Sequence, residues 1–250
     1  MNYWTKKNEM KRKAVEHTKE MMETHKDEIK HSIEATRTYG PEMGLVNREE
    51  HPVEMIVEQA DSVLAVLTHA KEGVKPAVAN FASYKNPGGM FIEGSKAQEE
   101  CLCHESTLYN VLSHCPSYYK WNNLHKNKAL YENRALFSED IVFERGGQIQ
   151  LCSVLTCAAP NYSAASKYMN IDPAENSEVL RKRISFIKKV LEAEGVDVFI
   201  FGAFGCGVFG QNPAEVAKIS KEVFATSSTI KRVYFSIIDE KTTSAFRNVI

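Results

Sequence analysis

Short apolar runs alternate with amphipathic helical segments along most of the chain. The apolar runs, which are typical of buried strands, lie at residues 53–58, 76–82, 141–143, 149–157, 196–201 and 232–238. Helical periodicity occupies residues 62–71, 97–113, 174–194 and 213–225. Strands that alternate with helices in this way predict an α/β fold, a three-layer α/β/α sandwich with a mixed, largely parallel sheet.

Local signals mark where several of these elements begin and end. Ser62 is expected to cap the helix at residues 62–71, and Gly73 lies just past its end. The dipeptide Gly146-Gly147 predicts a turn between two strands, whereas residues 116–138 are aromatic and irregular. One face of the helix predicted over 97–113 carries Cys101, His104, Leu108, Val111 and Cys115.

The N-terminal segment has a different pattern from the rest. Residues 5–38 contain no Pro or Gly and predict one long polar helix or a pair of helices. A narrow apolar stripe, repeating every seven residues, consists of Val15, Met22 and Ile29. Polar residues occupy the second heptad position that a coiled coil needs, so we expect a helix lying on the main domain. This gives an N-terminal helical extension at residues 1–44 and one domain at 45–250.

Composition narrows the classes of partner. The 250 residues include 31 basic and 32 acidic side chains, a net charge of −1, which gives no electrostatic basis for binding nucleic acid or a membrane. The charged N-terminus shows no secretory signal, and no apolar run is long enough to span a bilayer. We therefore expect a cytoplasmic protein and a monomer.

The six cysteines predict neither disulfides nor a metal site. None forms a CxxC pair, so reduced thiols are expected. Cys101, Cys103 and His104 are close in sequence but lack the spacing of a known zinc site. No metal and no cofactor are expected.

Residues 80–100, NFASYKNPGGMFIEGSKAQEE, carry the densest candidate chemistry. They join the end of a predicted strand to a Gly-Gly loop and to a helix that opens with two adjacent carboxylates. Backbone at a Gly-Gly loop can approach a ligand closely, and a helix N-terminus offers free N–H groups to anions. This combination indicates a site for a phosphate-linked sugar.

A second glycine-rich loop, GAFGCGVFG, spans residues 202–210 between a predicted strand and helix. Gly205, Gly207 and Gly210 satisfy the GxGxxG spacing of dinucleotide-binding proteins, so an NAD-dependent oxidoreductase is one alternative. Only 40 residues follow Gly210, however, which is too few for the remaining strand–helix units of such a domain.

The first loop resembles the signature of poly(ADP-ribose) glycohydrolases, in which three glycines precede a Gln-Glu-Glu triplet. The matching residues are Gly88, Gly89, Gln98, Glu99 and Glu100, and Met90 replaces the third glycine. The surrounding residues are similar to the microbial-type branch of that family. They comprise residues 80–83, 86–89, 97–100 and 106–109, with weaker similarity at 137–143 and 157–161. The resemblance implies a macrodomain-like fold.

The resemblance also implies roles for the first loop. Glu100 would be the general acid that protonates the leaving oxygen and then activates water, and Glu99 would hydrogen-bond a ribose hydroxyl. A carboxylate in a shielded cleft beside a diphosphate should have a raised pKa, which suits the acid. Asn80 would contact the distal ribose, and Asn86 would do the same or begin a turn.

The second loop resembles the diphosphate-binding loop of macrodomains. The resemblance implies that backbone N–H groups hold the pyrophosphate of ADP-ribose and that Phe209 orients the distal ribose. The loop residues concerned are Gly205, Cys206, Gly207 and Val208. For the adenine, Glu58 or Asp61 could serve, although Asp61 is alternatively a helix cap.

The resemblance thus implies an enzyme that hydrolyses ribose–ribose O-glycosidic bonds in poly(ADP-ribose) and releases ADP-ribose. Its substrate would be carried on modified proteins. The alternatives are a macrodomain that binds ADP-ribose or removes only mono-ADP-ribose, which Met90 keeps open, and the oxidoreductase. The sequence leaves open the attachment residue and whether cleavage begins at the polymer end.

Overall fold

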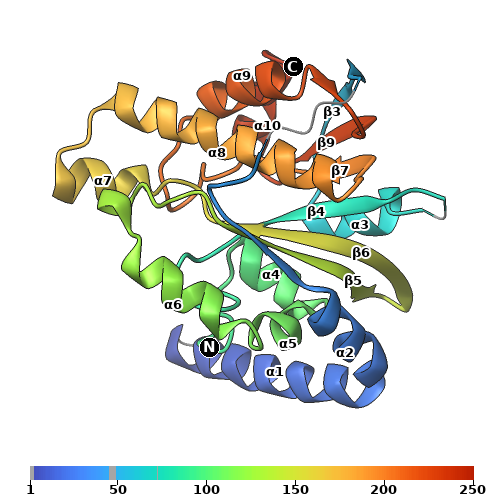
Figure 1. The fold of residues 1–250 in the computed structure, drawn as a ribbon. Helices are drawn as coiled ribbons and strands as arrows, with labels where there is room; N and C mark the ends of the chain where they lie inside the picture. The colour runs from blue at the N-terminus through green and yellow to red at the C-terminus, as the bar shows by residue number, and fades with distance from the viewer. Residues whose placement is uncertain (1–2, 45–48, 72) are drawn as a thin grey trace.

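The computed structural model describes residues 3–44, 49–71 and 73–250. Within these ranges, a seven-stranded mixed sheet has the strand order β1-β5-β6-β4-β7-β9-β3 and lies between two layers of helices (Figure 1). The five strands from β6 to β3 run parallel, and β5 and β1 pair antiparallel at the other edge. The predicted α/β/α sandwich with a mixed, largely parallel sheet is confirmed.

The strands of the main sheet follow the apolar runs of the sequence. They are β1 (Arg37–Tyr39), β3 (Glu54–Glu58), β4 (Pro76–Phe81), β5 (Ala135–Arg145), β6 (Gln148–Cys157), β7 (Val198–Ile200) and β9 (Arg232–Ser236). A separate antiparallel pair joins β2 (His51–Pro52) to β8 (Thr226–Ser227). The central strands are buried on both faces, which explains why they read as continuous apolar runs.

Each face of the sheet is covered by its own group of helices. One face carries α8 (Pro173–Ala193), α9 (Pro213–Val223) and α10 (Glu240–Arg247). The other face carries α1 (Tyr3–Thr24), α2 (Lys26–Ala35), α3 (Ser62–His69), α4 (Gln98–His104), α5 (Leu108–Leu112) and α6 (Pro116–Leu124). The helix α7 (Tyr162–Met169) and the 3₁₀ helix η1 (Asn127–Ala129) lie together beside these layers (Figure 1). No helix in the described ranges is long and apolar enough to cross a bilayer.

The single helix predicted over 97–113 is wrong, because the chain leaves the helix to pair with β5. Thr107 donates its backbone N–H to Val142 O at 3.0 Å, and its hydroxyl accepts the N–H of Val142 at 3.1 Å. These bonds divide the segment into α4 and α5. Cys101, which was expected on the apolar face, is exposed, and Cys103 is buried in its place.

Several further expectations need correction. Residues 116–138 are not irregular, since α6 begins there with Pro116 in its first turn. The helices α7 and α10 and the strand β1 were not predicted. Of the apolar stripe expected on the N-terminal helices, only Ile29 is buried; Val15 and Met22 are exposed. Ala14 and Met21, one position earlier, face the core, so the expected stripe was one residue out of phase within α1.

The N-terminal pair of helices packs on the main fold, as expected. The strand β1 that follows them pairs with β5. The division expected at residues 44 and 45 falls at the edge of residues outside the described ranges and stays a prediction. Helix α1 also contacts the loop of residues 88–95, where Lys11 pairs with Glu93 at 2.5 Å. A Cβ atom on Gly94 would lie 2.7 Å from the backbone oxygen of Lys7, so the loop and the helix touch backbone to backbone.

Because of this close approach, a substitution at Gly94 tests whether the packing of α1 against the loop stabilises the fold. Gly94→Ala should lower the free energy of unfolding by about 3 kcal/mol, because left-handed backbone and a clash with a main-chain atom add together. Gly195→Ala is the matched control: Gly195 is also left-handed, at φ +69°, but a Cβ there meets nothing within 4 Å. Gly195→Ala should lower the free energy of unfolding, measured in urea, by only about 1 kcal/mol. Equal losses of unfolding free energy in the two variants would show that the contact between α1 and the loop does not stabilise the fold.

Candidate active site

Glu99 and Glu100 open helix α4, which follows the glycine-rich loop after the carboxyl end of β4. Their side chains are only 3% and 6% exposed, yet both line a cavity of about 540 Å³. Acidic residues are favoured in the first turn of a helix because free N–H groups are available there. Burial of two adjacent carboxyl groups is far less common and requires specific hydrogen bonds.

The carboxyl group of Glu100 is bound by backbone N–H groups on both oxygens. Oε1 accepts the N–H of Met90 at 2.8 Å, and Oε2 accepts the N–H of Ala97 at 2.7 Å. The bond to Ala97 is half of a capping box, in which the third helical residue returns to the N-cap. Glu100 therefore fastens the glycine-rich loop to the start of the helix.

Glu99 is held from the opposite side, by the end of β4. Its Oε1 accepts Asn80 Nδ2 at 3.1 Å, and its Oε2 accepts the N–H of Ser83 at 2.6 Å. Burial raises the pKa of Glu99 to about 8, and the neighbouring charge of Glu100 adds to the rise, while the hydrogen bonds oppose it. A raised pKa therefore occurs at Glu99, the carboxyl group that the resemblance assigns to a ribose hydroxyl.

The loop before α4 approaches both carboxyl groups because it contains glycine. Gly88 and Gly89 adopt φ of +63° and +62°. A Cβ atom on Gly89 would lie 2.5 Å from Glu100 Oε1, and one on Gly88 would lie 2.7 Å from the ring of Tyr109. Met90, at the position of the third glycine, is not among the left-handed residues, so its backbone tolerates a side chain. That side chain is 46% exposed and lines the cavity.

The opposite wall of this cavity is the loop after β7. Gly205 has φ +75°, and a Cβ there would lie 2.8 Å from Ala159 Cβ, so the loop packs directly on the chain after β6. Val208 is 83% exposed at the tip of the loop. Phe209 is half-buried, lines the cavity and packs edge-on against Tyr131, with ring centroids 6.2 Å apart.

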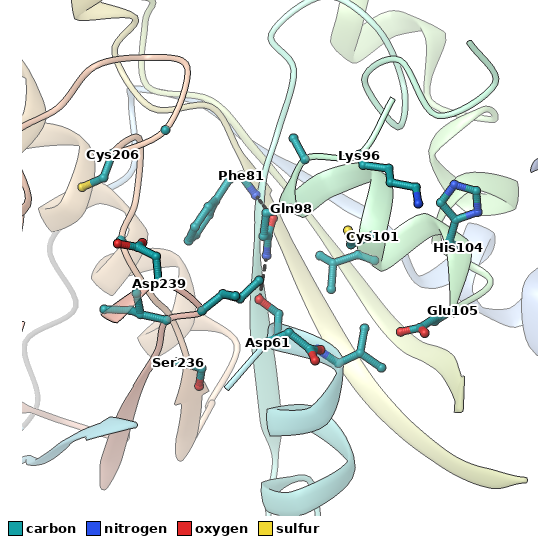
Figure 2. A pocket seen from close by; sticks show the side chains of 18 of the residues that line it. Asp61, Phe81, Lys96, Gln98, Cys101, His104, Glu105, Cys206, Ser236 and Asp239 are labelled. Carbon is teal, nitrogen blue, oxygen red and sulfur yellow. Dashed lines mark hydrogen bonds between the residues drawn. The ribbon is translucent and has the colours of Figure 1, made fainter. Parts of the chain in front are cut away.

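A larger cavity of about 730 Å³ adjoins the first and shares part of its lining. Figure 2 shows Gln98 at its centre, with Cys206 and Asp239 on one side and Lys96 and His104 on the other. Together the two cavities run from the carboxyl pair to the ends of β3 and β9. The space suits an elongated ligand with a sugar at one end.

Most of the residues predicted for the site come together at these cavities. The smaller cavity is lined by Gly89, Gln98, Glu99, Glu100, Gly205, Gly207, Val208 and Phe209. The larger one is lined by Asp61, Gln98, Cys206, Gly207 and Val208. Two loops that lie more than a hundred residues apart in sequence therefore line one cavity.

Asn80, Asn86 and Gly88 line neither cavity. Asn80 is fully buried behind Glu99 and also donates to Thr156 Oγ1 at 3.3 Å, so its expected direct contact with ribose is not available in this arrangement. Asn86 is exposed and forms the turn, because its carbonyl oxygen accepts the N–H of Gly89 at 3.1 Å.

The side chain of Gln98 has its hydrogen-bonding groups occupied by protein. Its Nε2 donates to Ala79 O at 2.7 Å and to Ser62 Oγ at 3.1 Å, and its Oε1 accepts the N–H of Phe81 at 2.8 Å. Gln98 therefore fastens the start of α4 to the end of β4, and it meets the cavity as part of the wall.

Asp61 caps α3, the alternative role that the sequence analysis gave it, and Ser62, the other expected cap, is the first residue of the helix. Its Oδ1 accepts the N–H groups of Val63 and Leu64 at 2.9 and 3.0 Å. The same carboxylate forms a bidentate ion pair with Arg145, at 2.9 and 2.8 Å. Arg145 was missed by the sequence analysis, since it comes from the β5–β6 hairpin and only the fold brings it to this cavity. Glu58, the other candidate for adenine, instead binds His69 and Ser236 and lines neither cavity.

No group of three His, Cys, Asp or Glu side chains within the described ranges is arranged to hold a metal ion. The buried carboxyl groups of the site are instead bound by backbone N–H groups and by one amide. The chemistry that the residues offer is that of two carboxyl groups facing a glycine-rich loop.

Residues 7–146, more than half of the chain, match the family model of the microbial-type PARG catalytic domain. The chain belongs to this family of poly(ADP-ribose) glycohydrolases. The match begins within α1 and includes Glu99 and Glu100. No protein with curated annotation matches the chain.

Solved bacterial structures share the whole fold. Poly(ADP-ribose) glycohydrolase from Thermomonospora curvata is 27% identical, with a TM-score of 0.84 over 97% of this chain and 100% of that one. The same enzyme bound to the inhibitor ADP-HPD gives 26% identity and a TM-score of 0.83 over the same shares of the two chains. The enzyme from Deinococcus radiodurans in complex with ADP-ribose is 27% identical, with a TM-score of 0.75 over 88% of this chain and 96% of that one.

The raised pKa of Glu99 makes folding stability depend on pH in a defined direction. Between the ordinary value of 4.5 and about 8, the folded state keeps a proton that the unfolded state has lost. The free energy of unfolding should therefore fall as the pH rises from about 5 to 8, by at most about 1.4 kcal/mol per pH unit from this group.

Glu99→Gln should remove this part of the pH dependence, because an amide does not titrate. Urea unfolding of both proteins at a series of pH values measures the two slopes. Glu178→Gln, a change at an exposed glutamate on α8, is the control and should leave the slope as in the original protein. If Glu99→Gln keeps that slope as well, Glu99 is not the group that holds the proton.

Proposed function

We propose that this protein hydrolyses ribose–ribose O-glycosidic bonds of poly(ADP-ribose) and releases ADP-ribose. The observation that carries the proposal is the pair of buried carboxyl groups that face a glycine-rich anion-binding loop across one cavity. Membership of the family supports it, as do the relatives bound to ADP-ribose and to ADP-HPD.

The geometry suggests how the substrate lies. Backbone N–H groups of the loop from Gly205 to Val208 would hold the diphosphate. The distal ribose would then lie between Phe209 and the carboxyl pair, and the adenosine would extend into the larger cavity toward Asp61 and Arg145.

In the proposed mechanism, Glu100 protonates the oxygen that leaves the distal ribose as the glycosidic bond breaks. The sugar passes through an oxocarbenium-like state, and Glu100, now ionised, takes a proton from the attacking water. Glu99 hydrogen-bonds a hydroxyl group of the ribose. The raised pKa of Glu99 supports this scheme, because it lets the carboxyl pair hold a proton near neutral pH.

Asn80 would act on Glu99 and not on the sugar. Its Oδ1 is buried and has no hydrogen-bond partner among the described residues, while its Nδ2 faces Glu99. A half-turn of the amide would present Oδ1 to a protonated Glu99, so the same side chain can serve both protonation states of Glu99.

Met90 favours a second candidate, a protein that binds ADP-ribose or removes mono-ADP-ribose without processing chains. Its side chain, at the position of a glycine in the family signature, lines the cavity beside the carboxyl pair. We also propose a cytoplasmic location, since the six cysteines are free thiols. The expected monomer and the absence of nucleic-acid binding stay predictions.

One experiment separates these functions. Protein carrying long poly(ADP-ribose) chains is incubated with the enzyme, and free ADP-ribose is quantified together with the remaining chain length. Shortened chains with free ADP-ribose support the proposal. Binding without shortening supports the second candidate, and tighter binding of NADH than of ADP-ribose in calorimetry would support an oxidoreductase.

Glu100→Gln should abolish turnover while leaving ligand binding almost intact. The amide keeps the shape of the side chain but cannot donate the catalytic proton, so the rate should fall by roughly three orders of magnitude or more. ADP-ribose affinity, measured by calorimetry, should change less than about threefold. Turnover in EDTA should equal turnover without it. Near-normal activity of Glu100→Gln, or loss of activity in EDTA, would contradict the mechanism.

Phe209→Ala tests whether that ring orients the ribose. Misplacing the sugar by about 1 Å should lower the rate on the order of a hundredfold. Because the ring is half-buried, the loss of stability should stay below the roughly 3–5 kcal/mol of a fully buried aromatic residue. Thermal unfolding and turnover are measured on one preparation. A large drop in Tm with normal turnover per folded molecule would make Phe209 a packing residue alone.

A further inference from the structure

Arg183, on α8, is a charged side chain that is only 1% exposed. Its Nε donates to Asn133 Oδ1 at 2.7 Å, its Nη1 donates to Ala158 O, and its Nη2 donates to Leu130 O at 3.5 Å. All three acceptors are neutral amide oxygens. Within the part of the chain that the structure describes, no carboxylate forms an ion pair with this guanidinium.

An arrangement of this kind is costly for a protein. The guanidinium group stays protonated at any physiological pH, so burial cannot be relieved by loss of the proton. Buried charges are normally paired with a charge of opposite sign, and an unpaired one destabilises the fold. An anionic ligand bound nearby would supply the missing counter-charge.

The hydrogen bonds of Arg183 place it behind the wall of the smaller cavity. Ala158, which accepts one of them, precedes Ala159, a residue that lines that cavity. The glycine-rich loop packs on the same segment, since a Cβ on Gly205 would lie 2.8 Å from Ala159 Cβ. One layer of backbone therefore separates the guanidinium from the loop expected to hold a diphosphate.

The charge of Arg183 also reaches the aromatic rings behind Phe209. Burial raises the pKa of Tyr84 to about 12, and the positive charge of Arg183 opposes this rise. Burial also raises the pKa of Tyr131, and the positive charge of Arg183 again opposes the rise. These two rings stack 4.0 Å apart, and Tyr131 packs against Phe209. The medium between Arg183 and the cavity is thus buried side chain and backbone, through which electrostatic attraction is weakly screened.

We propose that Arg183 is a specificity-determining residue that supplies a buried positive charge for the diphosphate of ADP-ribose without touching it. The inference rests on the proposed function, because it needs the diphosphate to lie at the loop of Gly205. The backbone N–H groups of the loop set the geometry of the anion, and Arg183 adds a preference for charged over neutral nucleosides.

The test compares an anionic ligand with a neutral one. Arg183→Met keeps the length of the side chain but removes its charge, so the Kd for ADP-ribose should rise roughly tenfold while the Kd for adenosine changes less than about twofold. Arg183→Lys restores the charge and should bring ADP-ribose affinity back to within about threefold of the original. Arg181→Met, an exposed arginine on the same helix, is the control and should change neither Kd.

A purely structural role would give a different result. It would weaken both ligands equally in Arg183→Met, and Arg183→Lys would not restore the difference; either outcome overturns the inference. If Arg183→Met does not fold, the salt dependence of ADP-ribose binding by the original protein tests the inference instead. Attraction by a buried charge should weaken less than about threefold between roughly 50 and 500 mM NaCl, whereas a steeper loss would assign it to surface lysines. Failure of the original protein to bind ADP-ribose would instead overturn the proposed function.

Discussion

Two adjacent carboxyl groups are buried at the start of one short helix, and backbone N–H groups hold them there. No lysine or arginine within the described ranges forms an ion pair with Glu99 or Glu100. Ser83, Met90 and Ala97 supply the N–H donors, which come from the segment after β4, the glycine-rich loop and the helix cap. These three segments of backbone must therefore keep their relative positions for the pair to remain buried.

Contacts around the site hold these three backbone segments in place. Gln98 ties the helix start to the end of β4 through its amide. Gly89 leaves room for the carboxyl oxygens, and Gly94 lets α1 lie directly on the outer side of the loop. The N-terminal helices are thus part of the support for the site, although they contribute little chemistry to it. A carboxyl pair held by the backbone keeps its geometry whether or not one member is protonated, which general acid–base chemistry requires.

The sequence predicted the sheet and both loops well, because hydrophobic periodicity, loop glycines and adjacent carboxylates are all local signals. It failed where distant contacts decide. Thr107 breaks a continuous helical pattern only because Val142 offers hydrogen bonds. Asn80 ends a strand, as a ligand-binding residue would, but its side chain turns inward to Glu99 and Thr156. Asp239 caps α10 by accepting the N–H of Thr242 at 2.8 Å, a local signal from which this helix could have been predicted.

The two sides of the cavity differ in charge, and this difference suits the substrate. On one side lie carboxyl groups, whose negative charge is reduced because burial raises the pKa of Glu99. On the other side lies a loop of backbone N–H groups with the guanidinium of Arg183 behind it. In the proposed binding mode, the second side would attract a diphosphate and the first side would repel it, so that field as well as shape would fix its position. The neutral ribose would then occupy the gap between them, with the glycosidic bond facing the carboxyl pair.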